Sequence, residues 1–437
     1  MNNIFATPRH LLPVPNHARV VHHPVLSKDG VLVTKQGHDP MTGVYVHMPD
    51  LRLLPVSVKP DDRELDQAWE WLFESDGLFG DFPFKDTDDD KGRSTMAHVL
   101  ALMLLPIIRG VIDGPIPAFV INKPMPGAGS GLFANVWNRT LNGRDCPTYA
   151  PPKRGGSEEL DKLIFGKLLS DPDSPMFFDN VERLESNSLA SAITSGSYAG
   201  RKLGVSEVVT MDVRHVWLFS GNNIDPSDEL ARRMIPINII PDVPRPELRS
   251  DFYHKDLPGW CMEYRPELIW SLCTLVQNWV AKGMPDGKKT LGSFDRWARV
   301  TGGILEAAGI GGFLDNISAW RDLSSSSNQQ DDEGIEAIFQ HVGAGVWFKA
   351  GEVFDHFYDE NAECLSINVP VRGREEQGKR TSFGTFLKNR KDKIYEIDGR
   401  TLKLSIRPGK PVEYLFTILT RCEEADTPNK VPRPEAA

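Results

Sequence analysis

The stretch from Ala118 to Ala134 constrains the fold more than any other part of the chain. An apolar strand (AFVIN) runs into a loop rich in proline and glycine (KPMPGAGSG), and a helix-compatible segment follows. A phosphate-binding loop needs this order, because glycines let backbone N–H groups turn inward and the next helix presents its positive N-terminus to the anion. The segment favours an α/β nucleotide-binding core, although an ordinary Gly/Pro loop gives the same short pattern.

The loop departs from the usual phosphate-loop motif, GxxxxGK[ST], at three positions. When Gly129 is taken as its last glycine, Ser130 stands where lysine belongs and Gly131 where the magnesium-binding hydroxyl belongs. Pro124 replaces the first glycine. The loss of one charge-assisted contact predicts that nucleotide binding is weaker by about 1.5–3 kcal/mol. Weak or absent hydrolysis is an open alternative.

Two buried strands downstream end in polar residues. Met176–Phe178 leads into Asp179, where a carboxylate can hold a magnesium ion through water, and Val216–Phe219 leads towards Asn222 and Asn223. An amide at Asn223 can orient the attacking water. The alternatives are a helix cap at Asp179 and a turn residue at Asn223. Their order behind the loop favours the nucleotide-binding interpretation.

Paired arginines, Arg232 and Arg233, follow nine and ten residues after Asn223. A guanidinium aimed at the nucleotide of a neighbouring subunit is an arginine finger, which stabilises charge on the γ-phosphate. The alternative is a solvated helix end.

Seven segments carry a family resemblance: GHDPMTGVYV, DFPF, KPMPGAGSGLFANV, MFFDNVERLESNSLASAIT, GRKLGVSE, SGNNIDPSDELARRM and SFDRWARVTGGILEAAGIGGFLDN. Together they resemble the P-loop replication proteins of phages, plasmids and integrated elements, which are related to superfamily-three and AAA+ helicases. The resemblance covers roughly residues 20–415. It implies an AAA+-like α/β core with a mostly parallel sheet, a helical lid and a C-terminal winged helix. It further implies ATP and Mg²⁺ as cofactors, a homo-oligomeric ring, with a hexamer favoured, and a primase or polymerase as a possible partner.

The resemblance also implies site residues, position by position. The nucleotide would be held by Lys123, Gly127, Ala128, Gly129, Ser130, Gly131 and Leu132, and catalysis would involve Asp179, Asn180, Asn223, Arg232 and Arg233, with the metal at Asp179. Asn180 stands where many AAA+ relatives carry a catalytic glutamate. Lys123 is a candidate substitute for the missing lysine, but a lysine at the end of a strand is more often solvated, and solvation is the favoured interpretation.

The expected organisation has six parts. They are an N-terminal small α+β module (1–90), the core (91–245), the helical lid (246–322), a linker (323–332), the winged helix (333–420) and a disordered tail (421–437). Within them, Val99–Ile112 predicts a buried helix, since it is short for a membrane span and carries Arg109.

Two regions are candidates for binding DNA. Arg201 and Lys202 lie in a glycine-rich stretch ahead of the Val216 strand, where ring helicases place a loop that grips phosphates. The alternatives are an exposed surface loop, or an Arg201 that reaches the nucleotide of a neighbouring subunit. Three helices are expected at Glu333–Val342, Lys349–Tyr358 and Arg380–Lys391, followed by a hairpin over Ile394–Ile406. Residues 372–410, which include the third helix and the hairpin, hold 12 basic and 5 acidic residues. The DNA-contacting candidates there are Arg380, Lys388, Arg390 and Lys391, and the alternative is a protein-binding winged helix.

The chain as a whole has a net charge of −10, so a contact with nucleic acid must be local and basic. Five scattered cysteines without a CxxC pair indicate reduced thiols, and the N-terminus lacks the apolar stretch of a secretion signal. Both features favour the cytoplasm, here that of a bacterial host, and no membrane partner.

The sequence therefore predicts a helicase-like ring ATPase that acts in the DNA replication of a phage or mobile element. Two alternatives stay open. One is a catalytically impaired scaffold or loader that binds nucleotide and DNA without efficient hydrolysis. The other is a winged-helix regulator with a vestigial phosphate loop.

Overall fold

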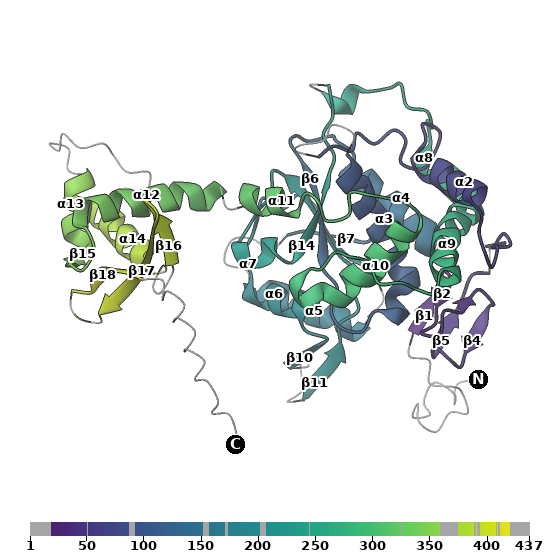
Figure 1. The fold of residues 1–437 in the computed structure, drawn as a ribbon, viewed down its shortest axis with the longest axis horizontal. Coiled ribbons are helices and arrows are strands. Elements are labelled where there is room, and N and C mark those ends of the chain that lie inside the picture. The colour runs from purple at the N-terminus through teal and green to yellow at the C-terminus, as the bar shows by residue number, and fades with distance from the viewer. Residues whose placement is uncertain are drawn as a thin grey trace, which may run out of the picture. The chain divides into compact units, whose positions relative to one another are not determined.

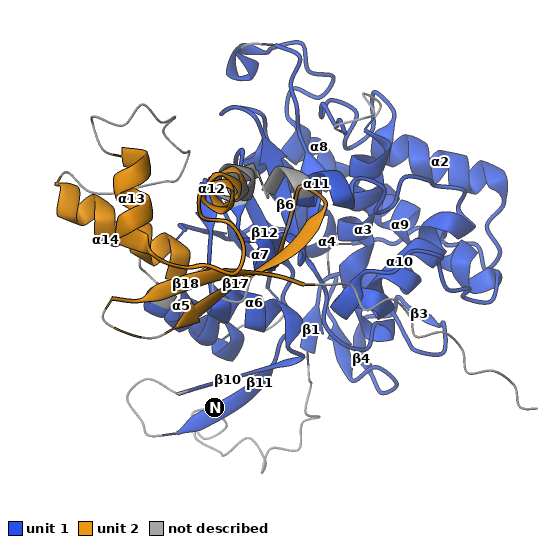
Figure 2. Ribbon diagram, turned by 60° about the vertical axis from the view of Figure 1, so that its left-hand side comes forward, with its two compact units in different colours: residues 1–324 blue, residues 325–437 orange. Residues whose placement is uncertain are grey.

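The computed structural model describes most of the chain. The described residues are 19–49, 51–86, 92–151, 157–170, 174–201, 207–243, 245–324, 326–358, 375–388, 390, 394–407, 409 and 411–419. They form two compact units, residues 1–324 and 325–437, each with its own apolar core (Figure 2). The predicted disordered tail and the DNA-contacting candidates Lys202 and Lys391 lie outside the described residues.

A five-stranded parallel sheet forms the centre of the first unit (Figure 1). Its strands, in spatial order, are β14 (Met234–Asn238), β6 (Ala118–Lys123), β12 (Trp217–Asn222), β8 (Met176–Phe178) and β7 (Thr148–Tyr149). The inner strands are buried on both faces, which explains why the sequence shows continuous apolar runs there and no alternation. This arrangement confirms the predicted α/β core with a mostly parallel sheet.

The register of the sheet brings three strand ends to one edge. Asn222 of β12 pairs with Lys123 of β6, and Phe219 of β12 pairs with Phe178 of β8. Because the strands are parallel, the residues that follow each of them lie at the same carboxyl edge, where ligands bind in open α/β sheets.

Helix α3 (Arg93–Ile108) lies against the sheet and continues as the 3₁₀ turn η2 (Arg109–Val111). By length and composition it could cross a membrane, but 83% of its most apolar window is buried inside the protein. The buried helix that the sequence predicted is confirmed, and it begins six residues earlier than expected.

The other elements of the core surround the sheet. The helices are α4 (Ser130–Asn142), α5 (Ser157–Ser170), α6 (Asn187–Thr194), α7 (Asp228–Ala231), α8 (Leu257–Glu263), α9 (Arg265–Ala281), α10 (Asp295–Ala307) and α11 (Ile317–Ser324), with the turns η3 (Pro246–Leu248) and η4 (Gly292–Phe294). Short β9 (Arg183–Leu184) pairs with β13 (Asp225–Pro226). Trp279 of α9 and Trp297 of α10 belong to the same apolar core as the sheet. The segment expected as a lid is therefore packed onto the core through its apolar faces.

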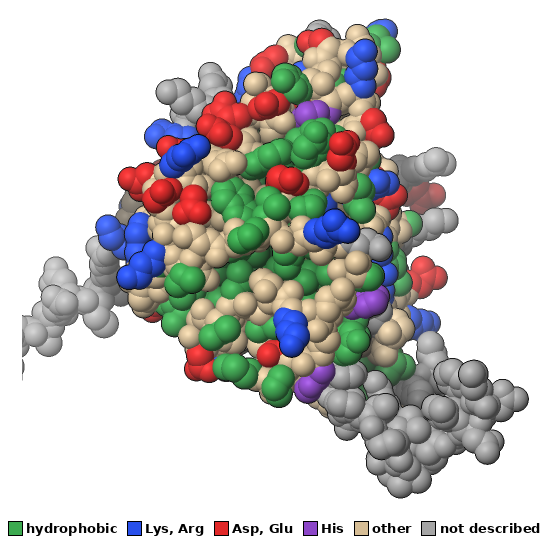
Figure 3. Space-filling view, turned by 90° about the vertical axis from the view of Figure 1, so that its right-hand side faces the viewer, with side chains coloured by type: hydrophobic (Ala, Val, Ile, Leu, Met, Phe, Trp, Pro, Cys, Tyr) green, Lys and Arg blue, Asp and Glu red, His purple; other side chains and the backbone are tan. Residues whose placement is uncertain are grey.

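The N-terminal strands form a small module beside this core. They are β1 (Arg19–Val21), β5 (Val44–Val46) and β4 (Gly37–Asp39) in one sheet, and β2 (Val25–Leu26) with β3 (Leu32–Val33) in another. Helix α2 (Asp62–Phe73) follows these strands, and Asp61 and Glu64 start it with a reciprocal capping box. Helix α2 lies against α9. Figure 3 shows this side of the molecule, where apolar side chains gather between charged ones.

The second unit contains three helices and a four-stranded antiparallel sheet. They are α12 (Ser326–Val342), α13 (Ala350–Tyr358) and α14 (Glu376–Lys388), with β15 (Trp347–Lys349), β18 (Glu413–Ile418), β17 (Arg400–Arg407) and β16 (Ile394–Ile397) in spatial order. The three helices and the hairpin appear in the predicted order, and Asp398 and Gly399 have the positive φ values of a tight hairpin turn. The stretch expected as a flexible linker is instead helical from Ser326, since its serine, glutamine and acidic residues suit the start of a helix.

Candidate functional site

The loop between β6 and α4 has the backbone of an anion-binding turn. Gly127 and Gly129 have φ values of 78° and 95°, in the left-handed region that favours glycine. Gly129 is the N-cap of α4 and no side chain caps that helix end, so its first N–H groups stay available to a ligand. Ala128 is buried and Gly131 is half-buried, whereas Leu132 is exposed in the first helical turn.

Lys123 stands directly under this loop. Its side chain is 6% exposed, and its Nζ donates a hydrogen bond of 2.8 Å to the Oγ of Ser130. Ser130 is the position where the usual motif has lysine. The favoured interpretation of Lys123 as a solvated strand end is therefore wrong, because the turn over Gly127–Gly129 brings Ser130 back over the end of β6.

A buried chain of hydroxyl groups continues from this contact. Ser220 of β12 is fully buried, and its Oγ lies 3.3 Å from the Oγ of Ser130 and donates a hydrogen bond to Oδ1 of Asp179. The chain Lys123–Ser130–Ser220–Asp179 thus joins a cation to a carboxylate through two hydroxyls. The opposite charges at its two ends compensate each other, which a buried cation requires.

The predicted polar strand ends surround this chain. Asp179 is half-buried at the end of β8, and the exposed Asn180 donates its backbone N–H to Oδ1 of Asp179 at 2.9 Å. Asn223, also exposed, donates its backbone N–H to the carbonyl of Lys123 at 2.9 Å. Both asparagines have positive φ, 58° and 47°, a conformation that asparagine tolerates better than most residues.

A cavity of about 710 Å³ opens beside the loop. Gly127, Ala128 and Gly129 line one wall, and Phe82, Phe252 and Lys255 line the others. Its size is that of a small-molecule site. The sequence carries no signal for these wall residues as part of a site. More than 100 positions separate Lys255 from the loop, and no local motif connects the two segments.

Two charged residues of this cavity have defined settings. Arg249 is held by ion pairs of 2.7 Å to Asp81 and 2.9 Å to Asp251, and its guanidinium lies 4.6 Å from the centre of the Phe252 ring. Glu247 lies against the loop, since a Cβ on Gly127 would come within 3.2 Å of its Oε2. An anion at the loop would be repelled by this carboxylate, so Glu247 must turn away when phosphate binds.

Arg232 and Arg233 lie at the opposite edge of the sheet. The carbonyl of Arg233 accepts the N–H of Ala118, at the start of β6, and β6 spans about 17 Å to Lys123. Arg233 is ion-paired with Glu229 at 3.2 Å and its side chain is 14% exposed. Burial lowers the pKa of Arg233, and the neighbouring Arg232 adds to this. Arg232 is exposed. Both arginines are therefore remote from the phosphate-binding loop of their own chain.

The DNA-contacting candidates occupy different settings. Arg201 ends β10 (Ser197–Arg201), which pairs with β11 (Val208–Asp212) in a hairpin that extends from the core (Figure 1). In the second unit, Lys388 is exposed, whereas Arg390 lies 3.7 Å from the centre of the Phe386 ring. Arg380 forms ion pairs with Glu376 and Asp355 within its own unit, so its guanidinium is less available to a DNA phosphate than the sequence suggests.

Comparisons with known proteins return no match to a family model and none to a curated protein. Among solved structures, the C-terminal region of NrS-1 in its A-form apo state is 11% identical, with a TM-score of 0.40 over 95% of this chain and 88% of that one. The SCCmec type IV protein Cch, described as an active helicase, is 15% identical, with a TM-score of 0.36 over 94% of this chain and 80% of that one. Scores this low do not establish a shared fold.

Proposed function

We propose that this chain is an ATP-dependent, helicase-like DNA replication protein of a mobile element that works as a ring. The observation that carries the proposal is the buried hydrogen bond between Lys123 and Ser130, because it puts an ammonium group where the phosphate loop lacks its usual lysine. The left-handed glycines and the uncapped start of α4 support an anion at the same place.

Each group of the site has a separate task in this proposal. The N–H groups of Gly127–Gly131 and the Nζ of Lys123 hold the phosphates, and the base lies in the cavity beside Phe82 and Phe252. Asp179 holds a magnesium ion, which when bound neutralises charge on the phosphate oxygens. Asn223 orients the attacking water from the neighbouring strand end.

DNA is bound by other surfaces in this proposal. The hairpin β10–β11 grips the backbone through Arg201 and Lys202, and the second unit acts as a winged helix through Lys388 and its neighbours. Three helices followed by an antiparallel hairpin support this assignment, and so do the 12 basic and 5 acidic residues of positions 372–410, which include the third helix and the hairpin.

A second candidate function is a scaffold that binds nucleotide without efficient turnover. Two observations favour it: Asn180 carries no carboxylate beside Asp179, and Glu247 lies against the loop. The first feature would slow hydrolysis more than binding, whereas the second would also weaken binding, because Glu247 repels the phosphates.

Measurement of ATP binding and turnover, with and without single-stranded DNA, tests the proposal. We expect micromolar binding of a non-hydrolysable analogue in the presence of Mg²⁺ and turnover that DNA stimulates. Binding without turnover under every condition supports the scaffold. A protein that binds no ATP analogue at millimolar concentration contradicts both candidates.

Replacement of Arg232 by alanine should lower turnover by about 10³-fold while analogue binding changes little, because a finger acts on the transition state in a neighbouring subunit. Arg233→Ala is the matched variant. It removes the ion pair to Glu229, so it should lower the melting temperature with a smaller effect on turnover. Mixed rings of Arg232→Ala and Asp179→Asn subunits should regain part of the activity. If Arg232→Ala retains full turnover, the residue is no finger.

A further inference from the structure

A positively charged cavity lies at the amino edge of the central sheet, away from the phosphate loop. It measures about 230 Å³, and its lining includes Ser174 and Pro175, just ahead of β8, and Arg214 and Val216, just ahead of β12. We call it the inner cavity. Parallel strands begin at one edge of a sheet and end at the other, so the inner cavity and Lys123 lie at opposite ends of the strands.

Four arginines line the inner cavity, and none of the described residues that line it is acidic. They are Arg19 of β1, Arg109 of η2, Arg144 after α4 and Arg214 before β12. The guanidinium of Arg109 is held in place by hydrogen bonds to the carbonyls of Ile112 (2.7 Å) and Gly114 (3.1 Å). Among the described residues, no carboxylate forms an ion pair with Arg144 or Arg214.

Such a concentration of cations is unusual in a chain whose net charge is −10. Like charges in one cavity repel each other, and the repulsion is relieved when an anion enters. The histidine at the rim responds to the same environment: the pKa of His22 is lowered, chiefly by burial and further by Arg144. The cavity therefore suits a ligand that carries negative charge.

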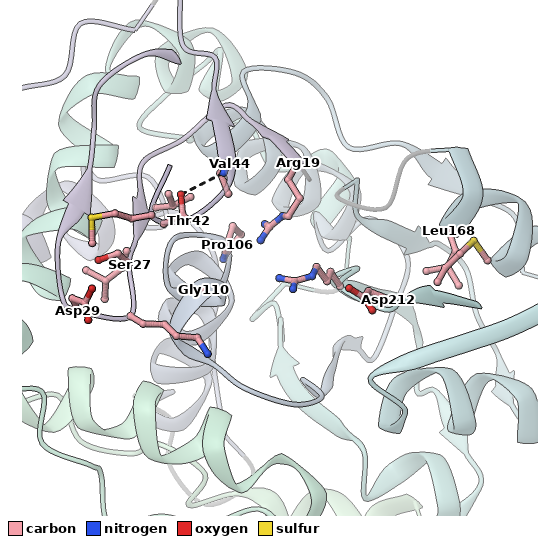
Figure 4. Close-up of a pocket in the computed structure, with 15 residues that line it drawn as sticks. Arg19, Ser27, Asp29, Thr42, Val44, Pro106, Gly110, Leu168 and Asp212 are labelled. Carbon is pink, nitrogen blue, oxygen red and sulfur yellow. Dashed lines mark hydrogen bonds between the residues drawn. The ribbon is translucent and has the colours of Figure 1, made fainter. Parts of the chain in front are cut away.

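A larger cavity of about 750 Å³ adjoins the inner one and shares Arg19, Pro106 and Arg214 with it. Figure 4 shows the side chain of Arg19 reaching into the space between Pro106 and Asp212. Its apolar lining includes Leu26, Pro106, Leu168 and Met211. Met211 and Asp212 belong to β11, so this outer cavity reaches the base of the hairpin β10–β11.

The charges of the outer cavity are mixed. Lys28 there pairs with Asp113 at 2.7 Å, and Asp29 and Asp212 also line the space. A ligand that fits both cavities must therefore be anionic at one end and carry a less charged, partly apolar group beside it. A nucleotide unit of a nucleic acid chain has this pattern, because a phosphate alternates with a sugar and base.

We propose that the two cavities bind single-stranded nucleic acid, with a backbone phosphate between Arg19, Arg144 and Arg214 and the adjoining nucleotide against the apolar wall. The site extends the DNA-binding surface of the proposed function from the hairpin to the amino edge of the sheet. It does not involve the ATP-binding residues.

The test measures binding of the 437-residue protein to a fluorescent oligothymidylate of about 20 nucleotides at several salt concentrations. Each phosphate contact in a single strand contributes about 0.7 to the slope of log K against log salt. The double variant Arg144→Ala/Arg214→Ala removes the contact with the single phosphate of this site, so it should lower the magnitude of the slope by about 0.7. At 0.1 M salt, where one phosphate contact contributes about fivefold over a 1 M reference, affinity should fall by roughly fivefold.

The matched control is Arg52→Ala/Arg63→Ala, which removes two exposed arginines of the same unit that do not line either cavity. It should leave the slope and the affinity within about twofold of the unchanged protein. Binding of an ATP analogue should be unchanged in both double variants, so failure of this inference is distinguishable from failure of the ATP site.

Competition distinguishes a strand from a smaller phosphate compound. Thymidine monophosphate and inorganic phosphate should displace the oligonucleotide only at concentrations at least 100-fold higher than unlabelled oligothymidylate. Displacement by the mononucleotide at matched concentration would mean that the cavities hold a free nucleotide, which overturns the proposal. An unchanged slope in the Arg144→Ala/Arg214→Ala variant overturns it as well.

Discussion

Replacing Lys123 with methionine is expected to weaken binding of an ATP analogue by about ten- to hundredfold and to abolish measurable turnover. A charge-assisted hydrogen bond to a phosphate is worth about 1.5–3 kcal/mol, and each 1.4 kcal/mol corresponds to a factor of ten in affinity. Methionine keeps the length and apolar stem of lysine, so the packing under the loop is largely preserved. Titration calorimetry with a non-hydrolysable analogue and Mg²⁺ measures the change.

Two further variants make this result specific. Lys59→Met removes an exposed lysine of the same unit and should bind like the unchanged protein. Lys123→Ser/Ser130→Lys moves the ammonium group to the usual place in the motif and should recover most of the affinity lost in Lys123→Met. Melting temperatures of all variants separate lost binding from lost folding. Unchanged affinity in a folded Lys123→Met protein would show that the cation has no part in holding phosphate.

Acidification from pH 7 to pH 4.5 is expected to destabilise the first unit by several kcal/mol. His98 is fully buried in α3, and its Nδ1 lies 2.7 Å from the carbonyl of Pro236, while its Nε2 accepts the N–H of Leu314 at 3.2 Å. A ring that accepts at Nε2 has to be neutral, with its proton at Nδ1. Burial lowers the pKa of both His98 and His23 to about 4.

The direction of the effect follows from the proton balance. In the unfolded chain these histidines titrate near 6.5, and in the folded protein near 4. Their contribution to the free energy of unfolding is complete above pH 6.5. It is lost as the pH falls towards 4, at about 1.4 kcal/mol per pH unit for each histidine. Each one therefore accounts for about 3 kcal/mol in this window.

Urea unfolding followed by circular dichroism at several pH values measures this dependence. His98→Gln should lower stability at pH 7 and roughly halve the loss that these two histidines cause between pH 6.5 and pH 4.5, since His23 alone of the pair remains. Carboxylates whose pKa is lowered by arginine or lysine, such as Asp145, act at lower pH. Stability that stays constant from pH 6.5 to pH 4.5 would mean that neither histidine is buried in its neutral form.

Much of the fold could be predicted because it depends on local patterns. The capping box at Asp61 and Glu64 defines the start of α2, and the Asp398–Gly399 turn defines a hairpin, since each needs only residues a few positions apart. The continuous apolar strands and the glycines after β6 indicated a parallel sheet with an anion-binding turn. The absence of a lysine after Gly129 was equally plain from the sequence.

Only the tertiary structure decided where the charges of the site lie. Ser220 and Asp179 are 41 positions apart, and they meet because β12 and β8 are neighbours in register, which no periodicity reveals. Lys123 reaches Ser130 because the loop turns back through two left-handed glycines. The four arginines of the inner cavity come from four separate elements. Local sequence determined the elements and the turn, because their energetics are short-ranged, whereas packing between distant elements determined which side chains share a site.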